Sequence, residues 1–350
     1  MISEQQIIDQ LRTVKYPGFT RDIISFGLIK GIRIEGSTVS LNLHITTTDT
    51  KVPHEIEEAS RAAVQAIPGV EEVAFQTQIT APLTAAMQAG PGTQTKIEGV
   101  EHVIVVASGK GGVGKSTVSA NLALALSKFG LKVGLCDCDI YGPSVALMYG
   151  ACDAQPTATE DERINPVDQY GIRLMSMGFL LGDDSPAILR GPMVTRYTQQ
   201  FLRNVAWGKL DVLVLDLPPG TGDIQLTIVQ TVRLSGAIIV TTPQEVALID
   251  ARKAAAMFRK VSVSILGLVE NMSYFLCPSD QKRYDIFGTG GGQREAERLG
   301  VPLLGQIPLD METRIAGDEG KPIVLSQPES QISQAFIKTA EKLHKKLLKN

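Results

Sequence analysis

The stretch Gly109-Lys110-Gly111-Gly112-Val113-Gly114-Lys115-Ser116 determines which fold this 350-residue sequence can adopt. Its glycines allow the backbone to wrap around an oligophosphate with the N–H groups pointing inward. The apolar run Val103–Ser108 before it predicts a buried strand, and the spacing of Lys115–Phe129 after it predicts a helix that Gly130 ends. A glycine-rich loop between a strand and a helix is typical of a P-loop. We therefore predict a nucleotide-binding site at this loop.

The P-loop pattern assigns chemistry to individual side chains. We expect Lys115 to contact the β and γ phosphates of ATP, and we expect Ser116 to bind Mg²⁺. The N-terminus of the following helix adds a favourable dipole for the phosphates. The predicted nucleotide-binding residues of the loop are Gly109, Lys110, Gly111, Gly112, Val113, Gly114, Lys115, Ser116 and Thr117. The pattern indicates an ATP hydrolase in which Lys115 is catalytic.

Apolar runs alternate with helical patterns along residues 97–350, which predicts an α/β domain with a mostly parallel sheet and helices on both faces. The predicted strands are Val103–Ser108, Val133–Asp137, Ile172–Ser176, Val212–Asp216, Ala237–Thr241, Ile265–Asn271 and Leu303–Ile307. The predicted helices are Lys115–Phe129, Gln225–Leu234, Val246–Arg259, Gly291–Leu299 and Gln331–Leu348.

Residues 1–80 predict a separate small α+β domain. A helix over Ser3–Thr13 precedes two alternating segments, Leu28–Ile34 and Thr38–Ile45, and the turn between them predicts a hairpin. A second helix, Pro53–Ala66, and a third strand, Val70–Thr77, follow. Residues 81–96 are rich in Pro, Gly, Ala and Thr without a sustained period, and we interpret them as a linker.

Acidic residues close two of the predicted strands of the large domain. Asp137 and Asp139 follow one apolar run, and Asp216 ends another in the Walker B arrangement. Carboxylates at the C-terminal ends of parallel strands face the crevice in which ligands bind. We expect Asp216 to hold Mg²⁺ through water, whereas Asp137 and Asp139 could instead be helix caps or turn residues. The loop 217–223 has the prolines and glycines of a switch segment that the γ-phosphate could order.

Composition and charge argue against several classes of protein. The net charge of −3 offers no basic surface for nucleic acid. The apolar runs are far shorter than the roughly 20 residues that cross a bilayer, and the N-terminus lacks the pattern of a secretory signal. Four cysteines are too few for a disulfide scaffold in a chain of this length and fit a reducing compartment. We expect a cytoplasmic protein with no nucleic-acid or membrane partner.

Lys110 is an additional lysine inside the loop, and here the sequence resembles the deviant Walker P-loop of the family that contains MinD, ParA, the arsenite-pump ATPase and the nitrogenase iron protein. Further segments narrow the resemblance: Ser108–Ser116, Asp137–Ser144, Leu189–Met193, Asp216–Asp223, Asn271–Phe275 and Gly288–Gly292. Together they resemble the Mrp/ApbC (Nbp35/Ind1-like) iron–sulfur cluster carrier ATPases over about residues 97–345. Residues 1–80 resemble the MIP18-type domain often fused ahead of them.

The resemblance implies roles that the residues alone leave open. It implies a homodimer in which Lys110 reaches the partner's phosphates and is catalytic, with apo iron–sulfur proteins as clients. It assigns Asp137 to the Mg²⁺ shell and Asp139, also catalytic, to the attacking water. It assigns Asn271 to the binding of the nucleotide base. The alternative is that Asn271 is a turn residue at the end of its strand.

The sequence departs from this family at the cysteines. These carriers commonly have Cys-Pro-x-Cys, and two such pairs from a dimer can hold a [4Fe–4S] cluster, whereas this chain has Cys277-Pro278-Ser279-Asp280. Cys277 is therefore the candidate cluster ligand, and Asp280 replaces the second thiol. The N-terminal segment Thr46–Lys51 also lacks the cysteine found in many relatives. Cys136 and Cys138 are expected to be buried apolar thiols.

We therefore predict an ATP-dependent iron–sulfur cluster carrier or assembly factor. One alternative is a MinD/ParA-like positioning ATPase, which an amphipathic membrane helix would favour. The basic segment Lys338–Lys349 is the candidate, but its interleaved apolar residues favour docking on the sheet. A second alternative is a nucleotide-gated adaptor without a metal, which the missing cysteine favours.

Overall fold

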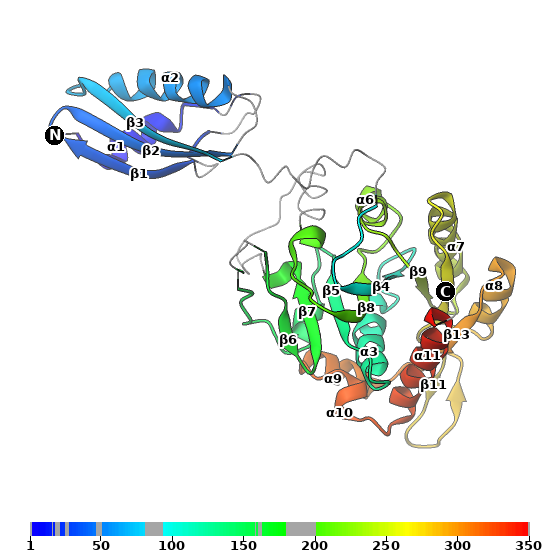
Figure 1. Cartoon of the computed structure of the whole chain (residues 1–350). Coiled ribbons are helices and arrows are strands. Elements are labelled where there is room, and N and C mark those ends of the chain that lie inside the picture. The colour runs from blue at the N-terminus through cyan, green and yellow to red at the C-terminus, as the bar shows by residue number, and fades with distance from the viewer. Residues whose placement is uncertain are drawn as a thin grey trace. The chain divides into compact units, whose positions relative to one another are not determined.

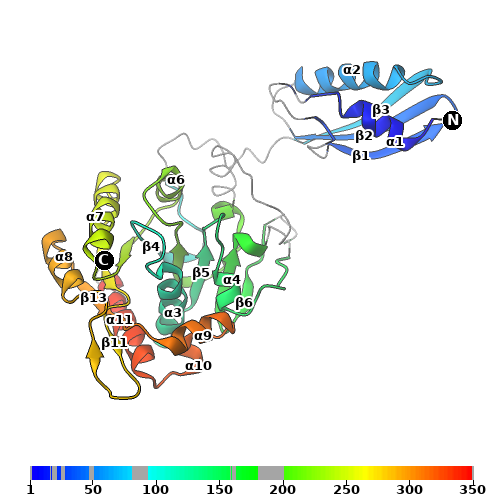
Figure 2. The ribbon, with the colours of Figure 1, turned by 180° about the vertical axis from the view of Figure 1, so that it is seen from behind.

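The computed structural model describes residues 2–15, 17, 22–24, 28–46, 51–80, 94–157, 159, 163–179 and 201–348. The chain divides into two units, Met1–Gly90 and Pro91–Asn350, which Figures 1 and 2 show from opposite sides. Each unit has a hydrophobic core of its own.

The N-terminal unit is a small sheet covered by helices. Its elements are α1 (Glu4–Leu11), β1 (Ile29–Glu35), β2 (Thr38–Thr46), α2 (Lys51–Gln65) and β3 (Glu72–Thr80). β1 and β2 are antiparallel and form the predicted hairpin, whose turn contains Gly36 at φ +64°. β2 pairs with β3 in parallel. Every second residue of β2 faces the core, where Leu41 and Leu43 pack with apolar residues of both helices. The predicted α+β unit is thus confirmed.

The C-terminal unit is built around an eight-stranded sheet with the order β13-β10-β9-β4-β8-β5-β7-β6. The strands are β4 (Val100–Ala107), β5 (Val133–Asp137), β6 (Val167–Gln169), β7 (Ile172–Ser176), β8 (Leu210–Asp216), β9 (Gly236–Thr241), β10 (Ile265–Glu270) and β13 (Leu303–Gln306). All neighbouring pairs are parallel except β6–β7, which is antiparallel. The prediction of a mostly parallel sheet is correct.

Helices cover both faces of this sheet because its central strands are apolar on both sides. The helical elements are α3 (Lys115–Ser127), α4 (Val145–Met148), η2 (Met177–Phe179), α6 (Asp223–Thr231), α7 (Glu245–Lys260), α8 (Gly291–Leu299), α9 (Met311–Asp318), α10 (Ile323–Ser326) and α11 (Gln331–Leu347). In β4, Ile104 and Val106 belong to the core with α3 and α11, whereas Val103 and Val105 belong to the core with α6. Figures 1 and 2 show α10 beside α3 and α11, which it contacts.

The predicted strands and helices begin and end within three residues of those in the structure. The elements of two to four residues, α4, β6, η2, α10 and the hairpin β11 (Phe275–Leu276) with β12 (Arg283–Tyr284), were not predicted, because so few residues carry no measurable period. The eight-residue helix α9 was also missed. The apolar side of α11 is buried against α3 and β13, as the sequence predicts. None of the described helices has the length and apolarity of a membrane span.

Parts of the sequence analysis fall on residues outside the described ranges. They include residues 81–93 of the proposed linker, the segment Leu189–Met193, and Thr47–Thr50. Gln94 and Thr95, at the end of the proposed linker, hydrogen bond to backbone carbonyls of Val229 and Thr231 on α6. The linker and the domain bounds 1–80, 81–96 and 97–350 therefore remain a proposal.

Candidate functional site

The parallel topology brings the predicted site residues to one edge of the sheet. The P-loop follows β4, and the neighbouring strands β8 and β5 end at Asp216 and Asp137, which are register partners. Asn271 directly follows β10, two strands from β4 on the other side. Because the carboxyl ends of these strands meet at the same edge, residues that are up to about 160 positions apart in sequence form one site.

The glycines of the P-loop serve different purposes. Gly112 and Gly114 have φ angles of +80° and +77°, which L side chains rarely adopt. Gly109 is required for a different reason, since a Cβ there would lie 2.0 Å from the backbone oxygen of Asp250 on α7. At Gly111 the nearest atom to such a Cβ is 3.9 Å away, in Pro219. The loop thus lies directly against α7 at its first glycine.

This difference predicts unequal effects of two identical substitutions. Gly109→Ala forces the loop or α7 to move and is expected to destabilise the fold by about 1–3 kcal/mol or more, whereas Gly111→Ala is expected to change stability by less than about 1 kcal/mol. Thermal unfolding of the nucleotide-free proteins measures this. Equal melting temperatures for the two variants would contradict the assigned role of Gly109.

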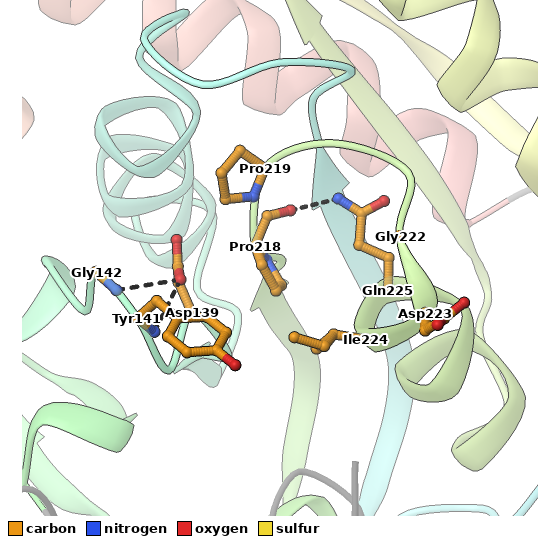
Figure 3. Close-up of a pocket in the computed structure, with 9 residues that line it drawn as sticks. All are labelled: Asp139, Tyr141, Gly142, Pro218, Pro219, Gly222, Asp223, Ile224 and Gln225. Atoms are coloured by element: carbon orange, nitrogen blue, oxygen red, sulfur yellow. Dashed lines mark hydrogen bonds between the residues drawn. The ribbon is translucent and has the colours of Figure 1, made fainter. Parts of the chain in front are cut away.

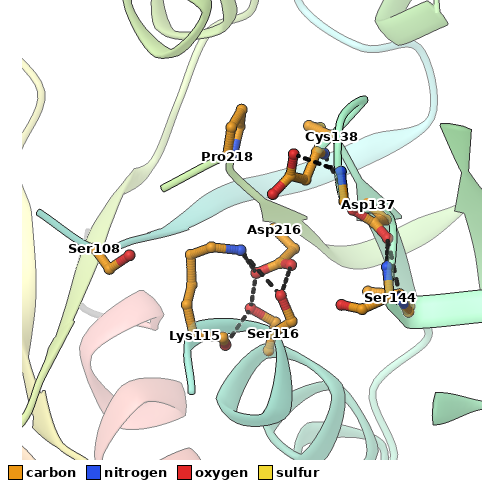
Figure 4. Close-up of polar contacts among 12 residues, drawn as sticks. Ser108, Lys115, Ser116, Asp137, Cys138, Ser144, Asp216 and Pro218 are labelled. Carbon is orange, nitrogen blue, oxygen red and sulfur yellow. Dashed lines mark hydrogen bonds and ion pairs between the residues drawn. The ribbon is translucent and has the colours of Figure 1, made fainter. Parts of the chain in front are cut away.

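Asp216 is the polar centre of the site. It is fully buried, and its Oδ1 lies 2.7 Å from Nζ of Lys115, which is itself 6% exposed. The hydroxyl of Ser116 donates to Oδ2 of Asp216 at 2.6 Å, and the hydroxyl of Ser119 donates to Oδ1 at 2.6 Å. Figure 4 shows Lys115 and Ser116 directed at this carboxylate. The predicted lysine, serine and strand-end acid are therefore in contact.

Asp137 is buried beside Asp216 and is held by backbone donors. Its Oδ2 accepts from the N–H groups of Ser144 and Val145 at 2.9 and 3.0 Å, and its Oδ1 accepts from the N–H of Asp139 at 3.1 Å. Figure 4 shows the Ser144 contact. Burial first, and then the charge of Asp216, raise the pKa of Asp137 to about 7, against the lowering effect of these backbone hydrogen bonds and of Lys115. Asp137 thus both lies at the site and holds the segment that follows β5.

Asp139 lines a pocket of about 420 Å³ between this segment and the loop after β8. Its carboxylate accepts from the N–H groups of Tyr141 and Gly142, both at 3.2 Å. Figure 3 shows Asp139 facing Pro218 and Pro219 across the pocket. On the far side the buried Gln225 donates to the carbonyl of Pro218 and so ties this loop to α6. The pocket therefore lies between the segment after β5 and the loop 217–223, which the sequence indicates as a switch segment.

Asn271 and Lys110 differ in the contacts that their side chains make at the P-loop. The Asn271 side chain is buried and its Nδ2 donates to the carbonyl of Val113 at 2.9 Å, so it braces the P-loop from the end of β10. Lys110 is half-buried, and its ammonium forms no ion pair with any of the described residues. Asn271 is thus used within the chain, whereas the charge of Lys110 is left available.

Cys277 begins the turn between β11 and β12. Its thiol is half-buried and lies 3.0 Å from the hydroxyl of Ser279. Asp280, in the same turn, accepts from the N–H of Lys282 at 3.0 Å and from the hydroxyl of Tyr284 at 2.8 Å. These hydrogen bonds, that from Lys282 foremost, lower the pKa of Asp280. Both carboxylate oxygens of Asp280 are therefore engaged in holding the turn.

The other cysteines are separate from this turn. Cys136 and Cys138 are buried, as predicted. Their sulfurs lie 3.8 Å apart, and burial raises the pKa of the Cys136 thiol. Cys152 is exposed. Within the described part of the chain, no group of three or more His, Cys, Asp or Glu side chains could hold a metal ion.

Two buried polar residues of the site were missed at the sequence level. Ser119 lies one helical turn after Lys115 and Ser116, and this spacing could have placed it on the same side of α3. Glu270, the last residue of β10, accepts from Ser273 at 2.6 Å and Gln306 at 2.8 Å and from the N–H of Gly292. It joins the segment after β10 to β13 and α8, which no local pattern indicates.

Comparison with known families matches both units of the chain. Residues 99–344 match the model of a family described as NUBPL iron-transfer P-loop NTPase. Residues 4–75 match that of a family described as iron-sulfur cluster assembly protein. The chain is similar to an iron-sulfur cluster carrier protein of Deinococcus radiodurans, with 47% identity over 96% of this chain and 93% of that protein.

Solved structures resemble the C-terminal unit. A nucleotide-binding protein of Archaeoglobus fulgidus in complex with ADP is 37% identical and superimposes with a TM-score of 0.60, over 68% of this chain and 93% of that chain. The cell division ATPase MinD of Pyrococcus furiosus is 27% identical with a TM-score of 0.54, over 70% of this chain and 98% of that chain. Both resemblances agree with the sheet and P-loop described above.

Proposed function

This chain belongs to the family of NUBPL iron-transfer P-loop NTPases, and on that basis we propose that it uses ATP to carry iron–sulfur clusters to apoproteins. The observation that carries the proposal is similarity to a carrier protein over 96% of this chain, whereas the MinD structure covers 70% of it. We propose that it acts as a homodimer in the cytoplasm. Its free cysteines favour a reducing compartment such as the cytoplasm.

In the proposed site, residues 109–117 surround the phosphates with backbone N–H groups, and Lys115 contacts the β and γ phosphates. The hydroxyl of Ser116 and the carboxylates of Asp137 and Asp216 are hard oxygen donors of the kind that Mg²⁺ takes together with phosphate and water. Bound Mg²⁺ would neutralise phosphate charge. Lys115 and Ser116 must then exchange their contacts with Asp216 for contacts with the nucleotide.

Asn271 supports the base assignment while bracing the loop. A side-chain amide has two N–H donors and a carbonyl acceptor. One donor is used by the carbonyl of Val113, which leaves an N–H and the carbonyl to pair with an adenine edge. We propose that Asn271 does both, so that occupation of the base site and the shape of the P-loop are linked.

Asp139 and Lys110 complete the proposed catalytic set. Asp139 borders the pocket next to the switch loop, where its carboxylate can orient an attacking water. Lys110 has no ion-pair partner among the described residues of its own chain, which fits a role at the partner's phosphates, where a cation stabilises developing charge. Each active site would then need Asp139 from one copy and Lys110 from the other.

Mixing two inactive variants tests this shared site. Lys110→Ala and Asp139→Ala are each expected to lower hydrolysis by about 10²-fold or more while sparing much of the nucleotide binding. A mixed dimer has one site with both residues intact, so mixing should recover up to about a quarter of wild-type activity per total site. Native mass spectrometry confirms that mixed dimers form. Mixed dimers without recovered activity would contradict the action of Lys110 across the interface.

The cargo assignment is tested by loading and transfer. After anaerobic reconstitution, iron and labile sulfide are measured on the purified protein, and ATP-dependent activation of an apo iron–sulfur enzyme is followed. We expect both, with Cys277 from two copies as the protein's thiolates. Loading without transfer would refute the carrier role. No loading alongside ATP hydrolysis would favour the metal-free adaptor, or a positioning ATPase if the protein bound a surface instead.

A further inference from the structure

Ser119 lies beneath the candidate magnesium site but belongs to no part of the P-loop motif. Its side chain is fully buried on α3, and its Oγ is 2.6 Å from Oδ1 of Asp216 and 3.1 Å from the carbonyl of Lys115. A hydroxyl has one proton to donate. The shorter contact is to a carboxylate, and charge-assisted hydrogen bonds are the stronger kind, so the Ser119 hydroxyl donates its proton to the hydrogen bond with Asp216.

The three side chains that donate to Asp216 are expected to behave differently when nucleotide binds. Two of them, Lys115 and Ser116, are the side chains that the proposed function turns toward phosphate and Mg²⁺. Ser119 lies in the second turn of α3, and a metal bound at Ser116 would leave its contact with Asp216 in place. It holds Oδ1, whereas Ser116 holds Oδ2, so the exchange would release Oδ2 toward the metal while Oδ1 stays fixed.

We infer that Ser119 is a positioning residue that keeps Asp216 directed at Mg²⁺ during this exchange. The inference rests on the proposed binding of Mg²⁺ and ATP and goes beyond it. Once Lys115 and Ser116 have turned toward the nucleotide, Ser119 is the one of these three donors that still holds Asp216. Without the Ser119 hydroxyl, the carboxylate has none of the three. The carboxylate can then rotate, and its geometry toward the metal is no longer fixed in advance.

A purely structural role for Ser119 makes a different prediction. Serine in a helix often donates to the carbonyl four residues earlier, and the Lys115 carbonyl is in that position. If this were its purpose, loss of the hydroxyl would change stability, and any effect on nucleotide affinity would be the same with and without Mg²⁺. A positioning role instead appears only when Mg²⁺ is present.

The test compares Ser119→Ala with Ser127→Ala, a serine on the same helix whose hydroxyl donates to the Leu124 carbonyl at 2.8 Å. The affinity of a fluorescent ATP analogue is measured in EDTA and across a Mg²⁺ titration. We expect Ser119→Ala to bind the analogue in EDTA within about twofold of wild type. The Mg²⁺ concentration at which half of the Mg²⁺-dependent increase in affinity for the analogue is reached should rise by about tenfold. Ser127→Ala should match wild type in both.

The outcomes separate this inference from the proposed function. An unchanged Mg²⁺ midpoint in Ser119→Ala, or equal losses with and without Mg²⁺, would overturn the positioning role. A wild-type protein whose affinity for the analogue did not depend on Mg²⁺ would overturn the magnesium site itself. If Ser119→Ala does not fold, Ser119→Cys, with its weaker donor, is measured in the same way and should also raise the midpoint.

Discussion

Replacement of Lys115 by alanine is expected to abolish detectable ATP hydrolysis. The ammonium is the group proposed to contact the β and γ phosphates and to stabilise the charge that develops there. Loss of one such preorganised contact lowers the rate by about 10²–10³-fold. The structure adds a second reason. Lys115 is 2.7 Å from the fully buried Asp216, so the alanine variant also leaves that carboxylate without its cation before nucleotide arrives. Steady-state phosphate release measures the effect.

Because a buried charge is left unpaired, loss of activity in Lys115→Ala has to be separated from loss of the fold. Lys115→Arg keeps a cation near Asp216 but replaces a compact ammonium by a planar guanidinium. It should unfold at nearly the wild-type temperature and still hydrolyse ATP far more slowly. Wild-type hydrolysis by a folded Lys115→Ala variant would contradict the assignment of the P-loop.

The fold could be predicted because its signals are local and strong. The C-terminal parts of the strands β4, β5 and β8 are apolar on both faces, so each appears as an apolar run that is followed by a polar residue, namely Ser108, Asp137 or Asp216. Their C-terminal ends then place Asp137 and Asp216 beside the P-loop without knowledge of any side-chain contact. The constraint at Gly109 could not be predicted, because it comes from the backbone of α7 about 140 residues later.

Contacts between distant segments account for what the sequence left open. The bond from Asn271 to Val113 spans 158 residues, so the motif indicates a base contact but not a brace under the loop. In the sequence, Asp280 stands where related carriers have the second thiol and is a possible cluster ligand. The hydrogen bonds to Lys282 and Tyr284 use both of its oxygens, which favours the turn. The same turn fixes the surroundings of Cys277.

The second large effect is expected at Cys277, since Cys277→Ser should abolish reconstituted cluster binding while ATPase activity stays within a few-fold of wild type. Serine keeps the size of the side chain and can still hydrogen bond to Ser279, so the turn should persist. The turn also has its own backbone bonds, from Cys277 to Lys282 at 3.0 Å and from Gln281 to Cys277 at 2.9 Å. Iron and labile sulfide per protomer are measured, with Cys152→Ser, at an exposed thiol, as the matched control.

The expectation for Cys277 depends on symmetry. One half-buried thiol per chain can bridge a cluster only if a two-fold axis brings two copies together, since such an interface presents the same residue from both sides. The protein would then supply two thiolates, and because Asp280 is held by its own turn, small-molecule thiols would complete the usual four ligands. A cluster bound in this way is exchangeable, as a carrier requires. Full loading of Cys277→Ser would refute Cys277 as a ligand and direct attention to Cys136, Cys138 and Cys152, whereas no loading of either protein would favour the metal-free adaptor.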